Sequence, residues 1–281
     1  MSTDLPVPGR ALRTDRTEPA VPIGPEATLR IADGIACIEL DRPARGNALS
    51  ALMVETLLGA LRAACADPSV HTVAFVAAGR HFCTGFDLSG LEDLSEGELL
   101  LRFVRVETLL DAVWRAPVRT VAIATGRTWG AGADLFAACD LRIAAADASF
   151  RFPGAAFGIV LGTRRLAERV GTERARQWVT TGATLDADAA ASAGLASRVA
   201  APADDGTPAD AWREALADGP SVDRETLAAI RAASRPAGGP GGDALADADL
   251  AALVRSAARP GLQARILAYR ERTRPPPRPG G

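Results

Sequence analysis

Two glycine-rich stretches of the sequence carry residue types that are suited to binding an oxyanion. Residues 79–88 follow the apolar run 72–78, and residues 126–135 follow the apolar run 121–124. Both runs have the composition of a buried strand. Glycine lets the chain turn sharply after a strand, and such a turn leaves backbone N–H groups free to point into a cavity. Two sets of free donors, brought together, would stabilise a negatively charged oxygen.

The second stretch also predicts the start of a helix. Small residues at 130–133 open it, and a helix start offers free N–H groups and a positive dipole end. Either stretch alone is typical of an ordinary turn or helix start. The combination, with each stretch following a strand, is much more specific and favours an anion-stabilising site.

The composition excludes several other kinds of chemistry. The chain has 281 residues, is 48% hydrophobic and has a formal net charge of −2, which indicates neither nucleic-acid nor membrane affinity. All 32 basic residues are arginine, so a lysine Schiff base is excluded. The 4 cysteines lack C-x-x-C spacing and the 2 histidines lack H-x-x-x-H spacing. We therefore expect buried thiols in a reducing cytoplasm and no metal site. No apolar run is long enough to cross a bilayer, so we expect no membrane span.

The two stretches resemble motifs of the crotonase, or enoyl-CoA hydratase/isomerase, superfamily. Residues 82–88 are similar to F-[SC]-[AT]-G-x-D-[LI], and residues 126–135 are similar to G-x-x-x-G-[GA]-G-x-[ED]-L. The resemblance extends from about residue 27 to residue 200. It implies an α/β fold with a crotonase-like ββα spiral core and a C-terminal helical region. It also implies an acyl-CoA substrate and no separate cofactor, since coenzyme A is part of the substrate.

The resemblance assigns three residues to catalysis. By position, the backbone amides of Phe86 and Ala131 would hold the thioester carbonyl oxygen as it becomes an enolate, and Asp134 would be an acid/base. The alternative role for Asp134 is a helix cap or an arginine partner. A typical hydratase of this family has a second acid at the position of Gly154. That glycine removes the second carboxylate and favours a reaction that needs only one.

The resemblance also implies a set of substrate-binding residues. Residues 42–49 are similar to a family loop that lies against coenzyme A, where Arg42 and Arg45 could meet its phosphates. A solvated loop is the alternative for Arg45, and Trp129 could either line the acyl pocket or fill the core. The predicted binding residues are Arg42, Arg45, Ala48, Thr84, Gly85, Asp87, Leu88, Trp129, Gly130 and Gly154.

The rest of the sequence predicts the domain organisation. We expect a flexible N-terminal arm at 1–25, the spiral core at 26–200, a C-terminal helical region at 201–273 and a disordered tail at 274–281. Within the core, Asp33-Gly34 predicts a hairpin, Ser50 predicts a helix start, and residues 141–152 predict one strand. The apolar helices after residue 200, together with the resemblance, imply a homotrimer or a dimer of trimers.

The leading hypothesis is therefore an acyl-CoA enzyme of the enoyl-CoA hydratase/isomerase type that stabilises a thioester enolate. One alternative is a crotonase-fold protein that binds coenzyme A, or acts as a scaffold, with weakened catalysis. Another is a divergent CoA thioester hydrolase, decarboxylase or ring-forming enzyme.

Overall fold

The computed structural model describes residues 21–200, 216, 219–234 and 244–273. Most of the predicted arm, the tail at 274–281 and part of the region after residue 200 lie outside the described residues. Strands of a larger sheet are β1 (Val21–Gly24), β2 (Ala27–Ala32), β3 (Ile35–Leu40), β4 (Thr72–Ala77), β5 (Arg119–Ala124), β7 (Leu141–Ala145) and β10 (Arg198–Ala200). Strands of a smaller sheet are β6 (Arg127–Trp129), β8 (Ser149–Arg151) and β9 (Thr184–Asp186).

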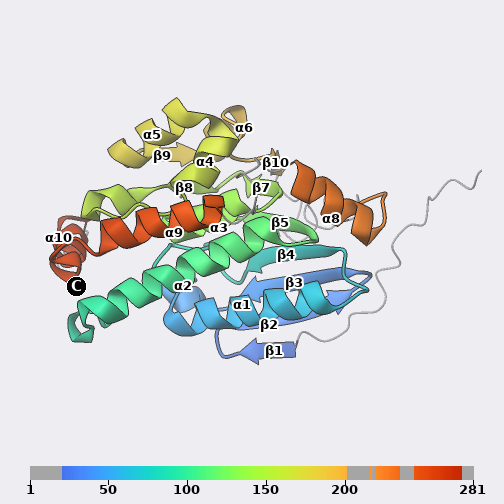
Figure 1. The fold of residues 1–281 in the computed structure, drawn as a ribbon, viewed down its shortest axis with the longest axis horizontal. Coiled ribbons are helices and arrows are strands. Elements are labelled where there is room, and N and C mark those ends of the chain that lie inside the picture. Colours follow the sequence, from blue (N-terminus) through green and yellow to red (C-terminus); the bar gives the residue numbers. More distant parts are fainter. Residues whose placement is uncertain (1–20, 201–215, 217–218, 235–243, 274–281) are drawn as a thin grey trace, which may run out of the picture.

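Helices surround these two sheets. They are α1 (Ala51–Ala66), α2 (Glu96–Arg115), α3 (Ala131–Ala138), α4 (Thr163–Val170), α5 (Thr172–Thr181), α6 (Ala187–Ser192), α8 (Arg224–Ala233), α9 (Ala244–Ala257) and α10 (Leu262–Thr273). Short 3-10 helices occur at η1 (Pro43–Arg45), η2 (Leu91–Asp93) and η3 (Pro153–Phe157). Figure 1 shows α1 and α2 crossing one face of the larger sheet, with α9 beside α2.

The larger sheet begins with the predicted hairpin. Strands β2 and β3 are antiparallel, with Ala32 opposite Ile35, and both turn residues are left-handed, at φ 50° for Asp33 and 77° for Gly34. From β3 onward the neighbouring strands β4, β5, β7 and β10 are all parallel. The carboxyl ends of β4 and β5 therefore lie at the same edge of the sheet. This arrangement brings together the two glycine-rich stretches that follow these strands.

The helices that flank the site have regular starts. Ser50 caps α1 by accepting a hydrogen bond from the Met53 amide at 2.9 Å. Ser95 and Glu98 form a capping box at the start of α2. The buried face of α2, which includes Phe103 and Val106, packs against α1, α3 and α9. These contacts hold α2 over the region that follows β4.

The structure differs from the sequence-based expectations in several places. The strand expected at 141–152 is two strands, β7 and β8, separated by a turn in which the Ala148 amide donates to the Ala145 carbonyl. They belong to different sheets, because β8 pairs with β6, a strand that was not expected within the second glycine-rich stretch. Strand β1 lies within the predicted flexible arm and pairs with β2.

The four cysteines differ in their burial. Cys83 and Cys139 are buried as expected, but Cys37 and Cys65 are only half-buried. Among the described residues, no helix is long and apolar enough to reach across a bilayer. The same part of the chain holds no group of three or more His, Cys, Asp or Glu side chains arranged to ligate a metal.

Candidate active site

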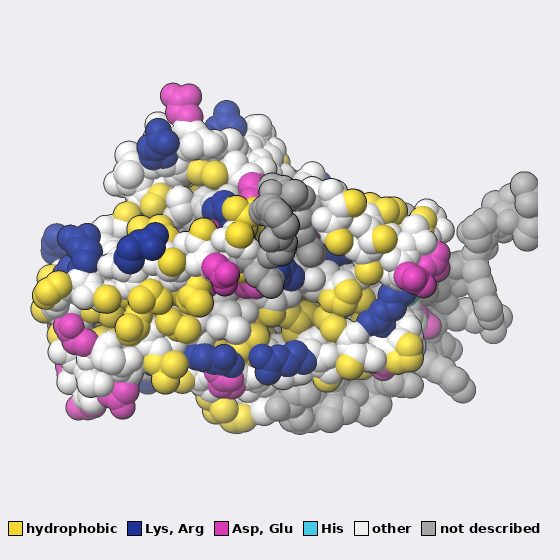
Figure 2. Space-filling model, in the orientation of Figure 1, with side chains coloured by type: hydrophobic (Ala, Val, Ile, Leu, Met, Phe, Trp, Pro, Cys, Tyr) yellow, Lys and Arg dark blue, Asp and Glu magenta, His cyan; other side chains and the backbone are white. Residues whose placement is uncertain are grey.

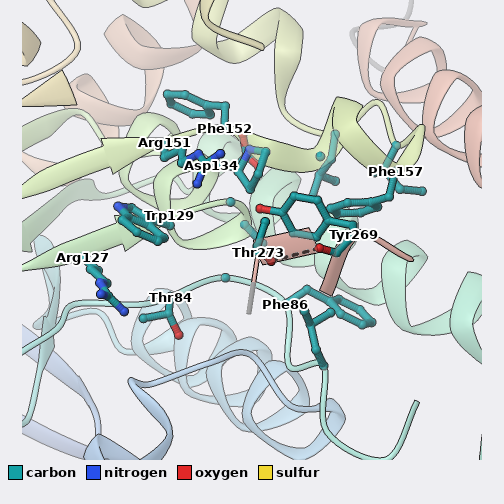
Figure 3. Close-up of a pocket in the computed structure, with 18 of the residues that line it drawn as sticks. Thr84, Phe86, Arg127, Trp129, Asp134, Arg151, Phe152, Phe157, Tyr269 and Thr273 are labelled. Carbon is teal, nitrogen blue, oxygen red and sulfur yellow. Dashed lines mark hydrogen bonds between the residues drawn. The ribbon is translucent and has the colours of Figure 1, made fainter. Parts of the chain in front are cut away.

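A cavity of about 640 Å³ opens where the two glycine-rich stretches meet. Figure 3 shows that its two ends differ in chemistry, with Arg127 and Trp129 at one end and Phe157 and Tyr269 at the other. Most of the predicted site residues line it. They are Arg45, Thr84, Gly85, Phe86, Leu88, Trp129, Gly130, Ala131, Asp134 and Gly154.

The two glycine-rich stretches are joined by backbone hydrogen bonds. The Trp129 amide donates to the Cys83 carbonyl at 2.9 Å, and the Cys83 amide donates to the Arg127 carbonyl at 3.3 Å. Gly85 has φ 101°, and a Cβ atom there would lie 2.8 Å from the Trp129 carbonyl oxygen and 3.5 Å from the Ala131 nitrogen. Only glycine allows so close an approach. Phe86 and Ala131 are therefore brought next to each other across the two stretches.

The amides of both residues donate no hydrogen bond within the part of the chain that the structure describes. Neighbouring groups on either side of Phe86 are paired, since the Leu49 amide donates to the Gly85 carbonyl and the Asp87 amide donates to the Leu49 carbonyl. The Phe86 amide itself donates to none of the residues that the structure describes. Ala131 opens α3, where first-turn amides have no acceptor within the helix, and no side chain caps this end.

Asp134 lies one turn further along α3 and lines the same cavity. Its side chain is almost entirely buried, with the residue only 6% exposed. Burial is the main reason why the pKa of the Asp134 carboxyl is raised well above 3.8, and the charge of Glu107 raises it further. Arg165 opposes both effects. The raised pKa means that burial favours the protonated form of this carboxyl.

Arg165 is the cation that faces Asp134 from α4. It is fully buried and donates two hydrogen bonds to the Glu107 carboxylate, at 2.5 and 3.2 Å. Asp111 and Asp249 lie 3.5 and 3.6 Å from the same guanidinium. Several carboxylates share this cation, and its effect on the pKa of Asp134 is smaller than that of burial or of Glu107.

Gly154, in η3, also lines the cavity. A Cβ atom there would lie 3.3 Å from the Ile159 carbonyl oxygen and 3.8 Å from the Ile159 Cβ. The position therefore has room for a side chain after a small adjustment. With glycine at this position, the wall carries no second carboxylate.

Three of the predicted binding residues do not line the cavity. Arg42 forms ion pairs with Asp87 at 2.6 Å and Glu26 at 3.0 Å, and it donates to the Ala48 carbonyl at 3.2 Å. The Asp87 carboxylate also accepts a hydrogen bond from the Ser89 amide, and its pKa is lowered by that bond and by Arg42, against the effect of burial. Arg42, Ala48 and Asp87 therefore bind one another, and their contacts fix the loop that carries Phe86.

Basic side chains that sequence reasoning did not single out lie at one end of the cavity. The Arg127 and Arg151 guanidinium carbons lie 4.8 and 5.8 Å from the centre of the Trp129 ring. Trp129 also donates to the Ser149 hydroxyl at 3.3 Å. His81 also lines the cavity, and its ring accepts a hydrogen bond from the Arg127 amide at 3.1 Å.

The apolar end was only partly predicted. Phe86 and Phe103 stack with ring centres 4.2 Å apart, and Phe157 and Tyr269 form a tilted pair at 5.2 Å. Tyr269 comes from α10, far along the chain from the other lining residues. The one signal in the sequence was that it is the chain's single tyrosine.

The α/β fold, with a largely parallel sheet and a cavity where the segments after β4 and β5 meet, can be compared with known families. The family model for enoyl-CoA hydratase/isomerase matches residues 30–275. The chain therefore belongs to the enoyl-CoA hydratase/isomerase family of enzymes, with the crotonase fold.

Individual relatives agree with this assignment. Probable enoyl-CoA hydratase echA6 of Mycobacterium leprae (strain TN) is 39% identical over 187 residues, which cover 64% of this chain and 72% of that protein. Probable enoyl-CoA hydratase EchA14 of Mycobacterium tuberculosis (strain ATCC 25618 / H37Rv) is 33% identical over 257 residues, covering 87% of this chain and 97% of that protein.

Solved structures give the same fold. A crystal structure from Bordetella parapertussis, assigned to the enoyl-CoA hydratase/isomerases, is 41% identical with a TM-score of 0.78, covering 89% of this chain and 99% of that chain. An enoyl-CoA hydratase/isomerase from Xanthobacter autotrophicus Py2 is 28% identical with a TM-score of 0.73, covering 89% and 99%.

Proposed function

We propose that the cavity binds an acyl-CoA thioester and that the amides of Phe86 and Ala131 hold its carbonyl oxygen as an enolate. The observation that carries this proposal is the meeting of two available amides and a buried carboxyl, Asp134, in one cavity. A preorganised donor is strongest where charge develops, and loss of one typically raises a barrier by about 3–4 kcal/mol. The positive end of the α3 dipole adds to this stabilisation.

Asp134 would carry the proton. In its ionised form it removes a proton from a carbon next to the thioester or conjugated with it, so that a C–H bond breaks and the electron pair moves onto the carbonyl oxygen. The same carboxyl then returns the proton to a different carbon, and the oxygen gives back the electron pair. The net result is a shifted double bond, and a single acid/base performs both steps.

Hydration of the double bond is less well supported. Adding water needs one group to activate the water and another to deliver the proton to carbon. By its resemblance to the family motif, Gly154 stands where a typical hydratase has its second carboxylate. We therefore favour double-bond isomerisation of an enoyl-CoA over hydration.

The basic end of the cavity suits the phosphates of coenzyme A. Arg127 and Arg151 lie at this end and Arg45 lines the same cavity, and guanidinium groups bind phosphate oxygens in a bidentate manner. The thioester would then lie between this basic end and the aromatic end.

Binding and turnover test the proposal separately. We expect isothermal titration calorimetry to detect crotonyl-CoA binding, and an absence of binding at millimolar ligand by folded protein would refute the proposal. Absorbance of the conjugated thioester should show conversion of a 3-enoyl-CoA to a 2-enoyl-CoA of the same mass, and the rate should fall about 100- to 10,000-fold in Asp134→Asn. Free acid, loss of CO₂ or a cyclised product from an acyl-CoA panel would instead identify a hydrolase, a decarboxylase or a ring-forming enzyme.

A binding or scaffold protein with weakened catalysis is the second candidate. The observations that favour it are Gly154 and the burial of Asp134, which disfavours the ionised form that would remove a proton. It predicts tight acyl-CoA binding with no product formed from any member of the panel. Turnover above that of Asp134→Asn would count against it.

We also propose that the protein is a homotrimer or a dimer of trimers. Figure 2 shows hydrophobic side chains gathered over the N-terminal half of α2, below the C-terminal helices. Leu101 on α2 is 58% exposed and Leu250 on α9 is 37% exposed. Such apolar surface favours association. Light scattering that gives the mass of one 29.1 kDa chain at micromolar concentration would refute this proposal.

A further inference from the structure

A second cavity, of about 300 Å³, lies between α1 and α2. Its walls are largely apolar and include Leu49, Val54 and Val106. At its rim, the Arg105 guanidinium and the half-exposed Glu55 carboxylate form an ion pair at 2.6 Å. An elongated apolar group would fit this cavity better than a charged one.

The Phe86 side chain separates this cavity from the candidate active site. Among the described residues, Phe86 is the one that lines both cavities. Its amide faces the proposed position of the thioester oxygen, while its ring forms the wall behind. An acyl chain that extends from the carbonyl carbon must therefore pass this ring before it can reach the cavity between α1 and α2.

The ring is held in place from both sides. It stacks on Phe103 with the ring centres 4.2 Å apart and the planes at 10°. The Arg102 guanidinium lies over it, 4.4 Å from the ring centre, and is fixed by a hydrogen bond to the Asp87 carbonyl at 3.0 Å. Aromatic stacking and a cation–π contact both favour this closed position.

We propose that the Phe86 side chain sets the maximum length of the acyl chain by closing the cavity between α1 and α2. This inference rests on the proposed function, because it requires an acyl-CoA whose carbonyl oxygen lies at the Phe86 amide. Truncation of the ring would join the two cavities and leave that amide unchanged. Each further methylene buried in an apolar cavity strengthens binding by about fourfold.

The experiment measures affinity against chain length. Butyryl-, hexanoyl-, octanoyl-, decanoyl- and dodecanoyl-CoA are titrated by calorimetry into the wild-type protein, Phe86→Ala and Phe86→Leu. We expect wild-type affinity to stop rising within the series. In Phe86→Ala it should continue to rise by about fourfold per methylene to a longer chain, with Phe86→Leu between the two. Thermal unfolding establishes that each variant is folded.

Two control variants distinguish the joining of the two cavities from a non-specific loss of packing around the site. Phe103→Ala removes the neighbouring ring, which lines the active-site cavity alone, and should not extend the chain length. Leu101 lines only the second cavity, so adding Leu101→Trp to Phe86→Ala should abolish the gain by filling it. A crystal structure of Phe86→Ala with dodecanoyl-CoA should show the chain end between α1 and α2.

The possible failures are distinguishable. The role of Phe86 would be overturned if affinity depended on chain length identically in the wild-type protein and Phe86→Ala, or if Phe103→Ala accepted equally long chains. Binding of short acyl-CoA would still support the proposed function in that case. An absence of binding by folded wild-type protein, for butyryl-CoA as for the others, would overturn the proposed function and this inference with it.

Discussion

The Asp134 carboxyl group lies directly against Gly162. A Cβ atom at position 162 would be only 2.6 Å from the Asp134 Cγ, and Gly162 itself is left-handed at φ 64°. Gly162 is also the N-cap of α4, the helix that carries Arg165. One glycine turn therefore determines both the space for the Asp134 carboxyl and the start of the helix whose cation faces it.

Gly162→Ala should displace Asp134. The left-handed backbone alone costs an L-residue about 1–2 kcal/mol, and the contact with the carboxyl adds to that cost. We expect a loss of stability in urea denaturation that exceeds the backbone strain, together with a loss of most of the turnover.

Gly90→Ala is the matched control. Gly90 has nearly the same backbone conformation, with φ 63°, but a Cβ atom there would meet nothing within 4 Å. It should show the backbone strain alone, with turnover retained. Equal effects of the two substitutions on turnover would contradict the proposed contact.

The Asp134 carboxyl should make stability depend on pH. Its pKa is raised in the folded state, mainly by burial, so the folded protein binds more protons than the unfolded chain above pH 3.8. The contribution of Asp134 to the free energy of unfolding is therefore fully present at low pH. It is lost as the pH rises through the raised pKa of the folded state. Asp134→Asn removes the ionisation, and its stability relative to the wild-type protein should increase over that interval. Urea denaturation across pH would show a constant difference if the assignment were wrong.

Gly154→Glu should introduce the missing second acid. The position accepts a Cβ atom with a shift of a few tenths of an ångström at Ile159. If the new carboxyl reaches the bound water, we expect the rate of crotonyl-CoA hydration to rise by about 10- to 100-fold. The rate is measured by the loss of absorbance of the conjugated thioester. Gly154→Gln has nearly the same size without the charge and should give no increase. An equal increase in both variants would show that proton transfer is not the cause.

Glycine-to-alanine substitutions in α3 and α1 should change the free energy of unfolding in opposite directions. A Cβ atom at Gly132 in α3 would lie 2.7 Å from the Cys83 Cβ and 2.8 Å from its sulfur, so Gly132→Ala should destabilise the protein by about 1–3 kcal/mol. It should also separate the two glycine-rich stretches and lower turnover. Gly59 in α1 is exposed and meets nothing within 4 Å, so Gly59→Ala should stabilise the protein by about 0.5–1 kcal/mol. Urea denaturation of both variants provides the comparison.

The sequence predicted elements whose signals are local. Asp33-Gly34 and Ser50 set a hairpin turn and a helix start through their own backbone and side-chain preferences, and both predictions are confirmed. The prediction of one strand at residues 141–152 was wrong, because this region forms both β7 and β8. Strand β8 pairs with β6, and a pairing between segments more than 20 residues apart leaves no local pattern in the sequence.

The candidate site shows the same distinction. Glycines with defined turn geometry could be found in the sequence, whereas Arg127 and Arg151 could not be told apart from other arginines. Their shared contact with Trp129 exists only after the smaller sheet has formed. Likewise, the ion pair of Arg42 with Asp87 joins two loops that are 45 positions apart.

The cavity takes its lining from residues as far apart in sequence as Arg45 and Thr273. At a translation rate of about 5–20 residues per second, the first and last of these emerge roughly 10 to 50 seconds apart. The apolar cluster that packs against Phe86, which includes Phe103 together with Leu262 and Ile266 of α10, therefore stays incomplete until α10 has emerged. During that interval a nascent chain exposes apolar surface of the kind that chaperones bind, so the yield of folded protein in a cell depends on what happens before synthesis is complete.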